Sequence, residues 1–189
     1  MEHWLPPCAK KREVFAWWEG TFTESELDWL QQKAKEGKID GLAGGEIKNT
    51  VRRNKIDWLS NTEDTAWVFE KLGMVASSLN AEYFSFDLSG FHESLQLCNY
   101  YEEAQGEYKW HQDFGGDFCR KLSLVLQLSD PSEYEGGDLQ IKTNAYEATM
   151  KKQRGLIIVF PSWTLHQVTP VVKGNRQSLV AWIAGPEFK

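Results

Sequence analysis

Short segments of strand-forming residues dominate the second half of this 189-residue chain. From about Phe84 onward they follow one another, and Gly, Asp, Asn or Pro separates each from the next. The segments are residues 93–101, 106–113, 121–129, 137–143, 155–161, 164–171 and 176–185. Regularly spaced short strands with such turn signals are typical of a β-sandwich or barrel. We therefore expect an antiparallel double sheet of jelly-roll type in a mainly β protein.

The first part of the chain predicts helices that cover this sheet. Thr23 and Glu26 have capping-box spacing, so a helix is expected to begin there and to end at Gly37. A second helix fits residues 61–80, with Asn61 or Thr62 as its cap. Its apolar stripe consists of Val68, Leu72, Val75 and Leu79.

The other early segments predict a strand at residues 13–18, a loop at 39–45 and a strand at 47–53. We expect one domain over residues 1–189. In this domain, residues 1–83 form a mixed α/β support and residues 84–189 form the β core.

Composition limits the function classes. The formal net charge is −6, so a large sequence-independent affinity for nucleic acid is not expected. Cys8, Cys98 and Cys119 are irregularly spaced and predict neither a disulfide framework nor a CxxC zinc site. No apolar run reaches membrane-spanning length, and the first residues lack the apolar core of a signal peptide. These features predict a cytoplasmic protein.

His111 and Asp113 form an HxD pair. Residues i and i+2 of a strand point to the same face, so both side chains could bind one ion. The pair alone is weak evidence, and His3 and His92 are poor partners because they lie in a terminal segment and a loop. His166, near the start of a late strand, is the candidate third ligand. Two histidines and one carboxylate are the pattern of non-haem Fe(II) oxygenases, but zinc hydrolases use the same set.

Arg176 begins the last predicted strand, on the same face as Ser178, Val180 and Trp182. A guanidinium buried without an anionic partner is costly, and it matches a carboxylate through two parallel hydrogen bonds. A dicarboxylate that chelates a metal at one end could meet Arg176 and the Ser178 hydroxyl at its other end. The alternative is a structural ion pair with an Asp or Glu.

Together these elements resemble the 2-oxoglutarate and Fe(II)-dependent dioxygenases, in particular the prolyl 4-hydroxylase-like branch and its PKHD-type microbial members. Their order is the HxD pair, a GGxL hairpin at 136–139, an FPS strand end at 160–162, His166, and Arg176 followed by Ser178. The likeness covers roughly Leu95 to Pro186, with a looser one in VRRNKIDWLS. It implies a double-stranded β-helix, jelly-roll or cupin-like, with the N-terminal helices on the larger sheet.

The resemblance also implies roles for individual residues. It makes His111, Asp113 and His166 the iron ligands and catalytic centre, and Arg176 the binder of the 2-oxoglutarate carboxylate. The cofactors would be Fe(II), 2-oxoglutarate and O₂, with ascorbate as reductant. Residues given lesser roles are Tyr101, Ser178 and Leu139 at the co-substrate and Arg120 as a substrate contact. Gln127 is a departure, because several prolyl hydroxylases have a tyrosine at that place.

The implied reaction is hydroxylation of a C–H bond in a peptidyl or free amino acid, above all proline, with release of succinate and CO₂. The expected partner is thus a peptide, protein or amino acid, and neither nucleic acid nor membrane is expected. Demethylation of nucleic acid bases on the same fold is an alternative, against which the negative net charge speaks. A non-enzymatic jelly-roll binding domain is a second alternative, against which the intact ligand set speaks. A zinc hydrolase is a third, and it would leave Arg176 unexplained.

Overall fold

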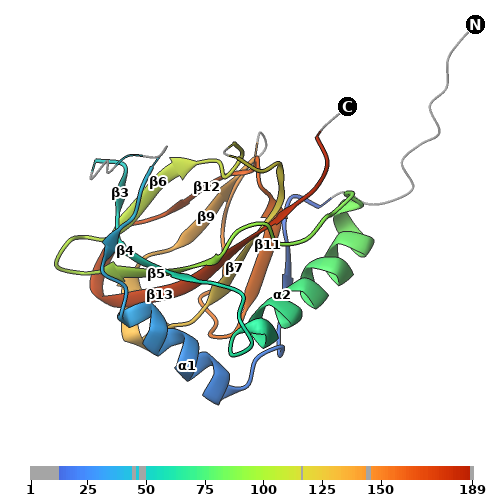
Figure 1. Cartoon of the computed structure of the whole chain (residues 1–189). Coiled ribbons are helices and arrows are strands. Elements are labelled where there is room, and N and C mark those ends of the chain that lie inside the picture. Colours follow the sequence, from blue (N-terminus) through green and yellow to red (C-terminus); the bar gives the residue numbers. More distant parts are fainter. Residues whose placement is uncertain (1–12, 44–45, 47–49, 116, 144–145, 188–189) are drawn as a thin grey trace, which may run out of the picture.

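The computed structural model describes residues 13–43, 46, 50–115, 117–143 and 146–187. Two antiparallel sheets face each other, and two helices cover one of them (Figure 1). The helices are α1 (Glu24–Lys35) and α2 (Ala66–Leu79), with a π-helical turn η1 (Asn80–Phe84) after α2 and a 3₁₀ turn η2 (Pro131–Glu133). The expected double sheet with flanking helices is confirmed.

The larger sheet has eight strands. Their order is β1 (Ala16–Trp18), β11 (Ile157–Pro161), β7 (Arg120–Gln127), β13 (Val171–Ala184), β5 (Leu95–Tyr101), β4 (Lys55–Leu59) and β2 (Ile39–Asp40), with β8 (Tyr134–Gly136) paired to β13. The smaller sheet has the order β10 (Glu147–Thr149), β9 (Leu139–Lys142), β12 (Leu165–Val168), β6 (Glu107–His111) and β3 (Arg52–Arg53).

The larger sheet is apolar on both faces because each face covers a different layer. On β7, Leu124 and Leu126 belong to the core beneath the helices, whereas Val125 belongs to the core between the sheets. On β11, Val159 belongs to the core beneath the helices and Ile158 to the core between the sheets. This alternation explains why LIIVF is apolar at every position.

Helix α1 begins as its capping box predicts. The Thr23 amide donates to Glu26 Oε2 at 2.8 Å, and the Glu26 amide donates to Thr23 Oγ1 at 3.4 Å. The helix ends at Lys35, two residues before the predicted Gly37. Its apolar residues Leu27 and Leu30 are buried against the larger sheet.

Helix α2 starts later than predicted, at Ala66, so a cap at Asn61 or Thr62 is wrong. The reason is a competing turn, since Thr65 Oγ1 accepts from the Thr62 amide at 2.9 Å and donates to Ser60 O at 2.6 Å. None of the helices in the described ranges is long and apolar enough to cross a membrane.

Two further expectations needed correction. Residues 39–45 are not all loop, because Ile39–Asp40 pairs with β4 as the sheet edge. Of the strand predicted at 47–53, the described part is strand only at Arg52–Arg53, and residues 47–49 lie outside the described residues. Whether these two short segments become strands depends on their pairing with neighbouring strands. A local sequence pattern does not show that pairing.

Candidate metal and co-substrate site

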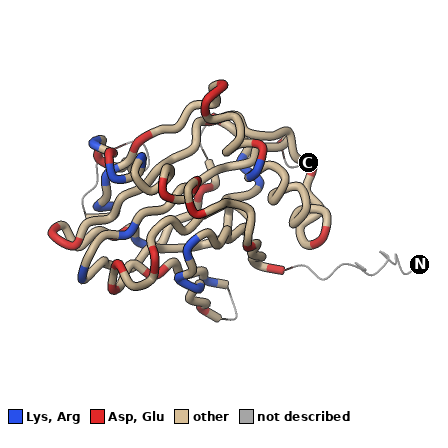
Figure 2. The backbone as a smooth tube through the Cα atoms, turned by 90° about the horizontal axis from the view of Figure 1, so that it is seen from below, with Lys and Arg blue, Asp and Glu red and all other residues tan. Residues whose placement is uncertain are grey.

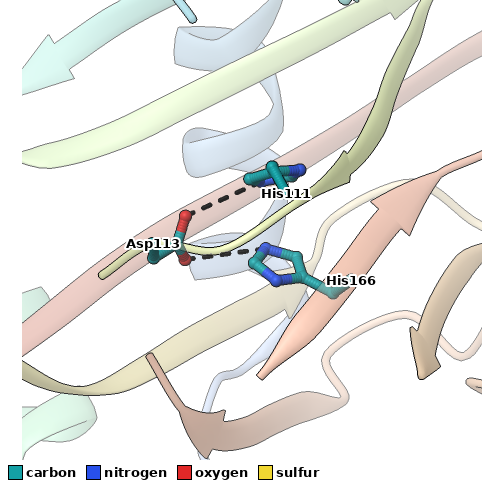
Figure 3. Close-up of side chains that lie close together, drawn as sticks. All are labelled: His111, Asp113 and His166. Atoms are coloured by element: carbon teal, nitrogen blue, oxygen red, sulfur yellow. Dashed lines mark ion pairs between the residues drawn. The ribbon is translucent and has the colours of Figure 1, made fainter. Parts of the chain in front are cut away.

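His111, Asp113 and His166 converge between the two sheets (Figure 3). His111 ends β6 and pairs directly with His166 on β12. Asp113 follows β6, and its amide donates to Ser162 O at 2.9 Å, which keeps its side chain on the same side as His111. His111 Nε2 lies 3.7 Å from Asp113 Oδ1, and His166 Nε2 lies 3.6 Å from Asp113 Oδ2. One ligand atom from each residue lies within 4.8 Å of the others.

Backbone carbonyls fix the tautomer of both histidines. His111 Nδ1 lies 2.7 Å from Lys109 O, and His166 Nδ1 lies 2.9 Å from Thr164 O. Because a carbonyl oxygen only accepts, each Nδ1 carries the proton and each Nε2 presents a lone pair to the carboxylate. The two Nε2 lone pairs and the Asp113 carboxylate, none of which carries a proton, therefore face one point. A cation bound at that point would stabilise this arrangement.

The charge states agree with this arrangement. Burial, together with the neighbouring His166 ring, lowers the pKa of His111 to about 3, so this imidazole is neutral. Burial raises the pKa of Asp113, but the positive charge that the His166 and His111 rings carry when protonated, together with hydrogen bonding from the Ser123 hydroxyl, outweighs burial and brings the pKa below its usual value. Ser123 Oγ donates to Asp113 Oδ2 at 2.7 Å. Neutral imidazoles and an ionised carboxylate are the forms that bind a divalent ion.

A cavity of about 640 Å³ opens beside the three residues and is lined from both sheets. Strand β13 contributes Arg176, Ser178, Val180 and Trp182, which is the face predicted from the period of two. The opposite face of β13 packs Leu179, Ala181 and Ile183 under the helices. The three candidate metal ligands (His111, Asp113 and His166) and Arg176 thus line one cavity.

Arg176 is only 1% exposed. Its guanidinium donates to Gln127 Oε1 at 2.9 Å and to Ser178 Oγ at 3.2 Å, while its Nε has no partner. No carboxylate among the described residues forms an ion pair with it, so the structural alternative of a pair with Asp or Glu finds no support. A buried, unneutralised guanidinium with a free N–H fits an anionic ligand.

The remaining predicted residues divide by position. Leu139 and Ser178 line the cavity. Tyr101 does not, and the tyrosine of β5 that does is Tyr100, which pairs directly with Arg176 across the sheet. Arg120 lines the cavity while its guanidinium pairs with Glu93.

Of the histidines and cysteines other than His111 and His166, some line the cavity and others do not. His92 accepts or donates at Ser89 Oγ, 3.0 Å away, outside the cavity lining. Cys98 is buried in the lining and Cys119 is not part of it. His3 and Cys8 lie outside the described residues.

Sequence reasoning missed Tyr108, whose ring stacks on His111 with centroids 3.4 Å apart. The two residues are three apart, so strict alternation would place them on opposite faces of β6. A bulge lies between His166 and Val168 in the pairing with β12, because these two residues oppose His111 and Tyr108 respectively. The extra residue on β6 brings both rings to one side.

Comparison with known proteins places the site in a family. The family model for the 2OG-Fe(II) oxygenase superfamily matches residues 95–184, which include the three ligands and Arg176. Residues 95–184 are thus similar to the 2OG-Fe(II) oxygenase superfamily. A PKHD-type hydroxylase of Synechococcus sp. (strain CC9605) is 42% identical over 42% of this chain. One of Prochlorococcus marinus is 50% identical over 33% of it. The matches span 37% and 28% of those two proteins, well under half of their length.

Solved structures share the fold of this chain. A Pseudomonas putida prolyl-4-hydroxylase superposes with a TM-score of 0.73 at 21% identity, covering 90% of this chain and 92% of the other. A Trichoplax adhaerens prolyl hydroxylase, in complex with a hypoxia inducible factor peptide fragment, gives 0.77 at 16% identity, with 91% and 84% covered. At these identities the likeness establishes the double-stranded β-helix fold.

The residues of this site fit the groups that the name of the matched family implies, Fe(II), 2-oxoglutarate and oxygen. His111, Asp113 and His166 would supply two imidazoles and a carboxylate, the ligand types of non-haem Fe(II) oxygenases. The unneutralised Arg176, beside the Ser178 hydroxyl, would suit the far carboxylate of 2-oxoglutarate.

Proposed function

We propose that this oxygenase hydroxylates a C–H bond of a peptidyl or free amino acid, with proline first among the candidates. 2-Oxoglutarate would be converted to succinate and CO₂ in the same cycle. The observation behind the proposal is the convergence, in one cavity, of the three metal-ligating side chains and an unneutralised Arg176.

The chain's own residues have defined tasks in this reaction. Bound Fe(II) and 2-oxoglutarate, with O₂ as the oxidant, would supply the chemistry that places one oxygen atom of O₂ in the C–H bond and the other in succinate. The Lys109 and Thr164 carbonyls hold the imidazoles with Nε2 toward the metal position, and Ser123 holds the carboxylate of Asp113. These contacts orient the ligands before any ion arrives, which reduces the reorganisation needed on binding.

Arg176 orients the co-substrate. Gln127, at the place where several prolyl hydroxylases have a tyrosine, accepts a hydrogen bond from Arg176 and so fixes the guanidinium plane. The Ser178 hydroxyl, 3.2 Å from the same guanidinium, is a second donor for a carboxylate. Apolar walls then keep water away from the reacting centre, and they are formed by Val125, Leu139, Val168 and Val180.

The mouth of the cavity supports an amino-acid or peptide substrate. Ile39, Leu42, Trp58 and Phe114 belong to the lining and are exposed to solvent. An apolar rim above a polar cavity floor suits a peptide, which combines apolar side chains with polar amides, better than a polyanion. The Trichoplax neighbour was solved with a peptide fragment, which favours the same class of substrate here.

The charge distribution speaks against base demethylation. The net charge is −6, and Figure 2 shows basic and acidic residues interspersed along the described part of the chain. A binding domain without catalysis would not need three deprotonated metal ligands beside a buried arginine. Ascorbate as reductant and a cytoplasmic location remain predictions.

The test is product formation. The protein is incubated with Fe(II), 2-oxoglutarate, ascorbate and a library of short proline-containing peptides, and succinate and the peptide masses are measured. We expect succinate formation together with peptides that gain one oxygen atom, and loss of both in His166→Ala. Succinate without any oxidised peptide or amino acid would reject the substrate class. No succinate from an iron-loaded protein under any substrate would reject the oxygenase reaction.

A further inference from the structure

A second buried arginine, Arg52, lines the same cavity and has no task in the reaction described above. It lies on β3 at the edge of the smaller sheet and is 6% exposed. Its Nε donates to Asn54 Oδ1 at 2.8 Å, and its terminal nitrogens donate to Leu42 O at 3.0 Å and Gln96 Oε1 at 2.6 Å. All three acceptors are neutral.

The charge of Arg52 is not neutralised within the described part of the chain. No ion pair joins it to an Asp or Glu there. A guanidinium has five N–H groups, and three of them are used on oxygen acceptors. The further neighbours of the guanidinium are the weak acceptor Cys98 Sγ, at 3.8 Å, and the Tyr108 side chain, and neither carries a negative charge at neutral pH. A buried cation in a cavity without an ionised partner fits an anionic ligand.

Arg52 lies close to the three candidate metal ligands. Its guanidinium lies 4.6 Å from the centre of the Tyr108 ring, and the Tyr108 ring stacks on His111. Arg52 is therefore one aromatic ring away from a proposed iron ligand. A group bound to it would lie close to the reacting centre.

The packing around Arg52 is specific. A Cβ atom on Gly41 would clash with Asn54 Oδ1 and with Arg52 Nε, so only glycine allows the Arg52–Asn54 pair to form here. The Gly41 amide also donates to Asn54 O at 3.1 Å. The guanidinium is thus held in place by neighbouring residues and is not a solvated surface charge.

Counting charge in the cavity shows what is missing. Arg52, Arg176 and a ferrous ion contribute four positive charges, while Asp113 and the 2-oxoglutarate dianion contribute three negative ones. Arg120 does not enter the count because Glu93 neutralises it. One positive charge remains, and Arg52 is the group without an anionic partner.

We propose that Arg52 binds a carboxylate of the substrate, which makes the substrate a free amino acid or the carboxyl-terminal residue of a peptide. This inference rests on the proposed function. The exposed apolar rim, with Leu42 and Trp58, then contacts the rest of the substrate. Both sources share one chemistry, a carboxylate near the C–H bond that reacts.

The test measures binding without turnover. The full chain is loaded with Fe(II) and 2-oxoglutarate under anaerobic conditions, and ligands are titrated by calorimetry. The ligands are a panel of amino acids, proline among them, each in three forms: the free amino acid, the N-acetyl acid and the N-acetyl amide. The variants are Arg52→Gln, Arg52→Lys and the control Arg53→Gln, because Arg53 is the next residue on β3, pairs with Glu107 and does not line the cavity.

We expect at least one acid to bind roughly tenfold or more tightly than its amide, since a charge-assisted pair is lost in the amide. Arg53→Gln should keep this preference and Arg52→Gln should abolish it, with Arg52→Lys between them. Tightest binding of a free amino acid would identify that source, and tightest binding of an N-acetyl acid would identify a peptide terminus. An unchanged Kd for 2-oxoglutarate in Arg52→Gln is part of the expectation.

Three results would overturn the proposal: no acid preferred over its amide in the natural chain, a preference that survives Arg52→Gln, or weakened 2-oxoglutarate binding in Arg52→Gln. The last would assign Arg52 to the co-substrate. Failure of the proposed function looks different, because the natural chain would then either not bind 2-oxoglutarate or form succinate without any oxidised peptide or amino acid, and neither result depends on Arg52. The acid and amide comparison, repeated without iron and co-substrate, would still report on Arg52.

Discussion

Replacing Arg176 by glutamine separates its binding role from any structural role. Arg176 is 1% exposed and has an unpartnered Nε, and among the described residues its guanidinium donates hydrogen bonds to the neutral groups Gln127 and Ser178. A structural arginine of this kind would be neutralised by a carboxylate, and its loss would destabilise the fold. An arginine that binds a ligand lowers the stability of the free protein, because its buried charge is unneutralised until the ligand binds. Its replacement should therefore leave the free energy of unfolding of the free protein unchanged or raise it.

The magnitude follows from the hydrogen bonds that a carboxylate would make. Hydrogen bonds to charged groups contribute about 1.5–3 kcal/mol each, and a bidentate pair has two of them. Glutamine keeps one neutral donor, so we expect a loss of about 3 kcal/mol, which is roughly 100-fold in the Kd for 2-oxoglutarate. The thermal stabilisation that 2-oxoglutarate gives to the iron-loaded protein should shrink accordingly.

The assay is calorimetric titration of 2-oxoglutarate into the anaerobic Fe(II) protein, with thermal denaturation of the free protein alongside. Arg154→Gln is the matched control, because Arg154 is also partly buried but pairs with Glu24 and Asp28 outside the cavity. The control should keep its affinity for 2-oxoglutarate. An unchanged Kd in Arg176→Gln would refute the reasoning and transfer the co-substrate carboxylate to another residue of the cavity.

Three further outcomes are expected. Ser123→Ala removes the hydroxyl that donates to Asp113 Oδ2, so Fe(II) affinity measured by competition with a chelator should fall by about 10-fold or more, whereas Ser132→Ala should not change it. Leu124→Ala opens a cavity under the helices, and the free energy of unfolding in urea should fall by about 2–5 kcal/mol; a loss within the error of the measurement would contradict the core assignment. The hydrogen bond from Lys71 is the largest cause that lowers the pKa of Glu26, so its stabilisation is present above the usual carboxyl pKa near 4.5 and is lost as the pH falls through the lower folded value. Glu26→Gln should thus reduce stability at neutral pH and converge with the natural chain in acid, and a deficit that persists in acid would contradict this.

The approach of Asp113 to His111 and the β13 face could be predicted because they depend on local rules. The period of two predicted that Asp113 and His111 share a face, and they do although Asp113 lies just beyond the end of β6; the same period puts Ser178 beside Arg176. The approach of His166 to His111 needed only that β12 return beside β6. The type of each residue then indicated the chemistry.

What the sequence did not reveal depends on pairing between distant strands. Tyr108 reaches His111 through a bulge, and no local pattern indicates where a bulge falls. Arg52 was not predicted as a cavity residue, because its burial depends on contacts with Gln96 and Leu42 from other segments. The position of Tyr100 could have been found, because the residue that pairs with Arg176 must share its face.

The start of α2 illustrates a different limit. Ser60, Thr62 and Thr65 form alternative hydrogen bonds that compete with the helix for several residues. A cap residue in the sequence shows that a helix can begin there, and the competing turn decides where it does. Element boundaries are accordingly less predictable than the elements themselves.

The central claim is that 2-oxoglutarate chelates Fe(II) held by His111, Asp113 and His166. The most direct test is the visible absorption spectrum of the anaerobic protein with Fe(II) before and after 2-oxoglutarate is added. The account predicts a weak charge-transfer band that appears with the natural chain and is absent in His166→Ala. If the natural chain binds Fe(II) and 2-oxoglutarate but shows no such band, the two do not meet at this site, and the account is contradicted.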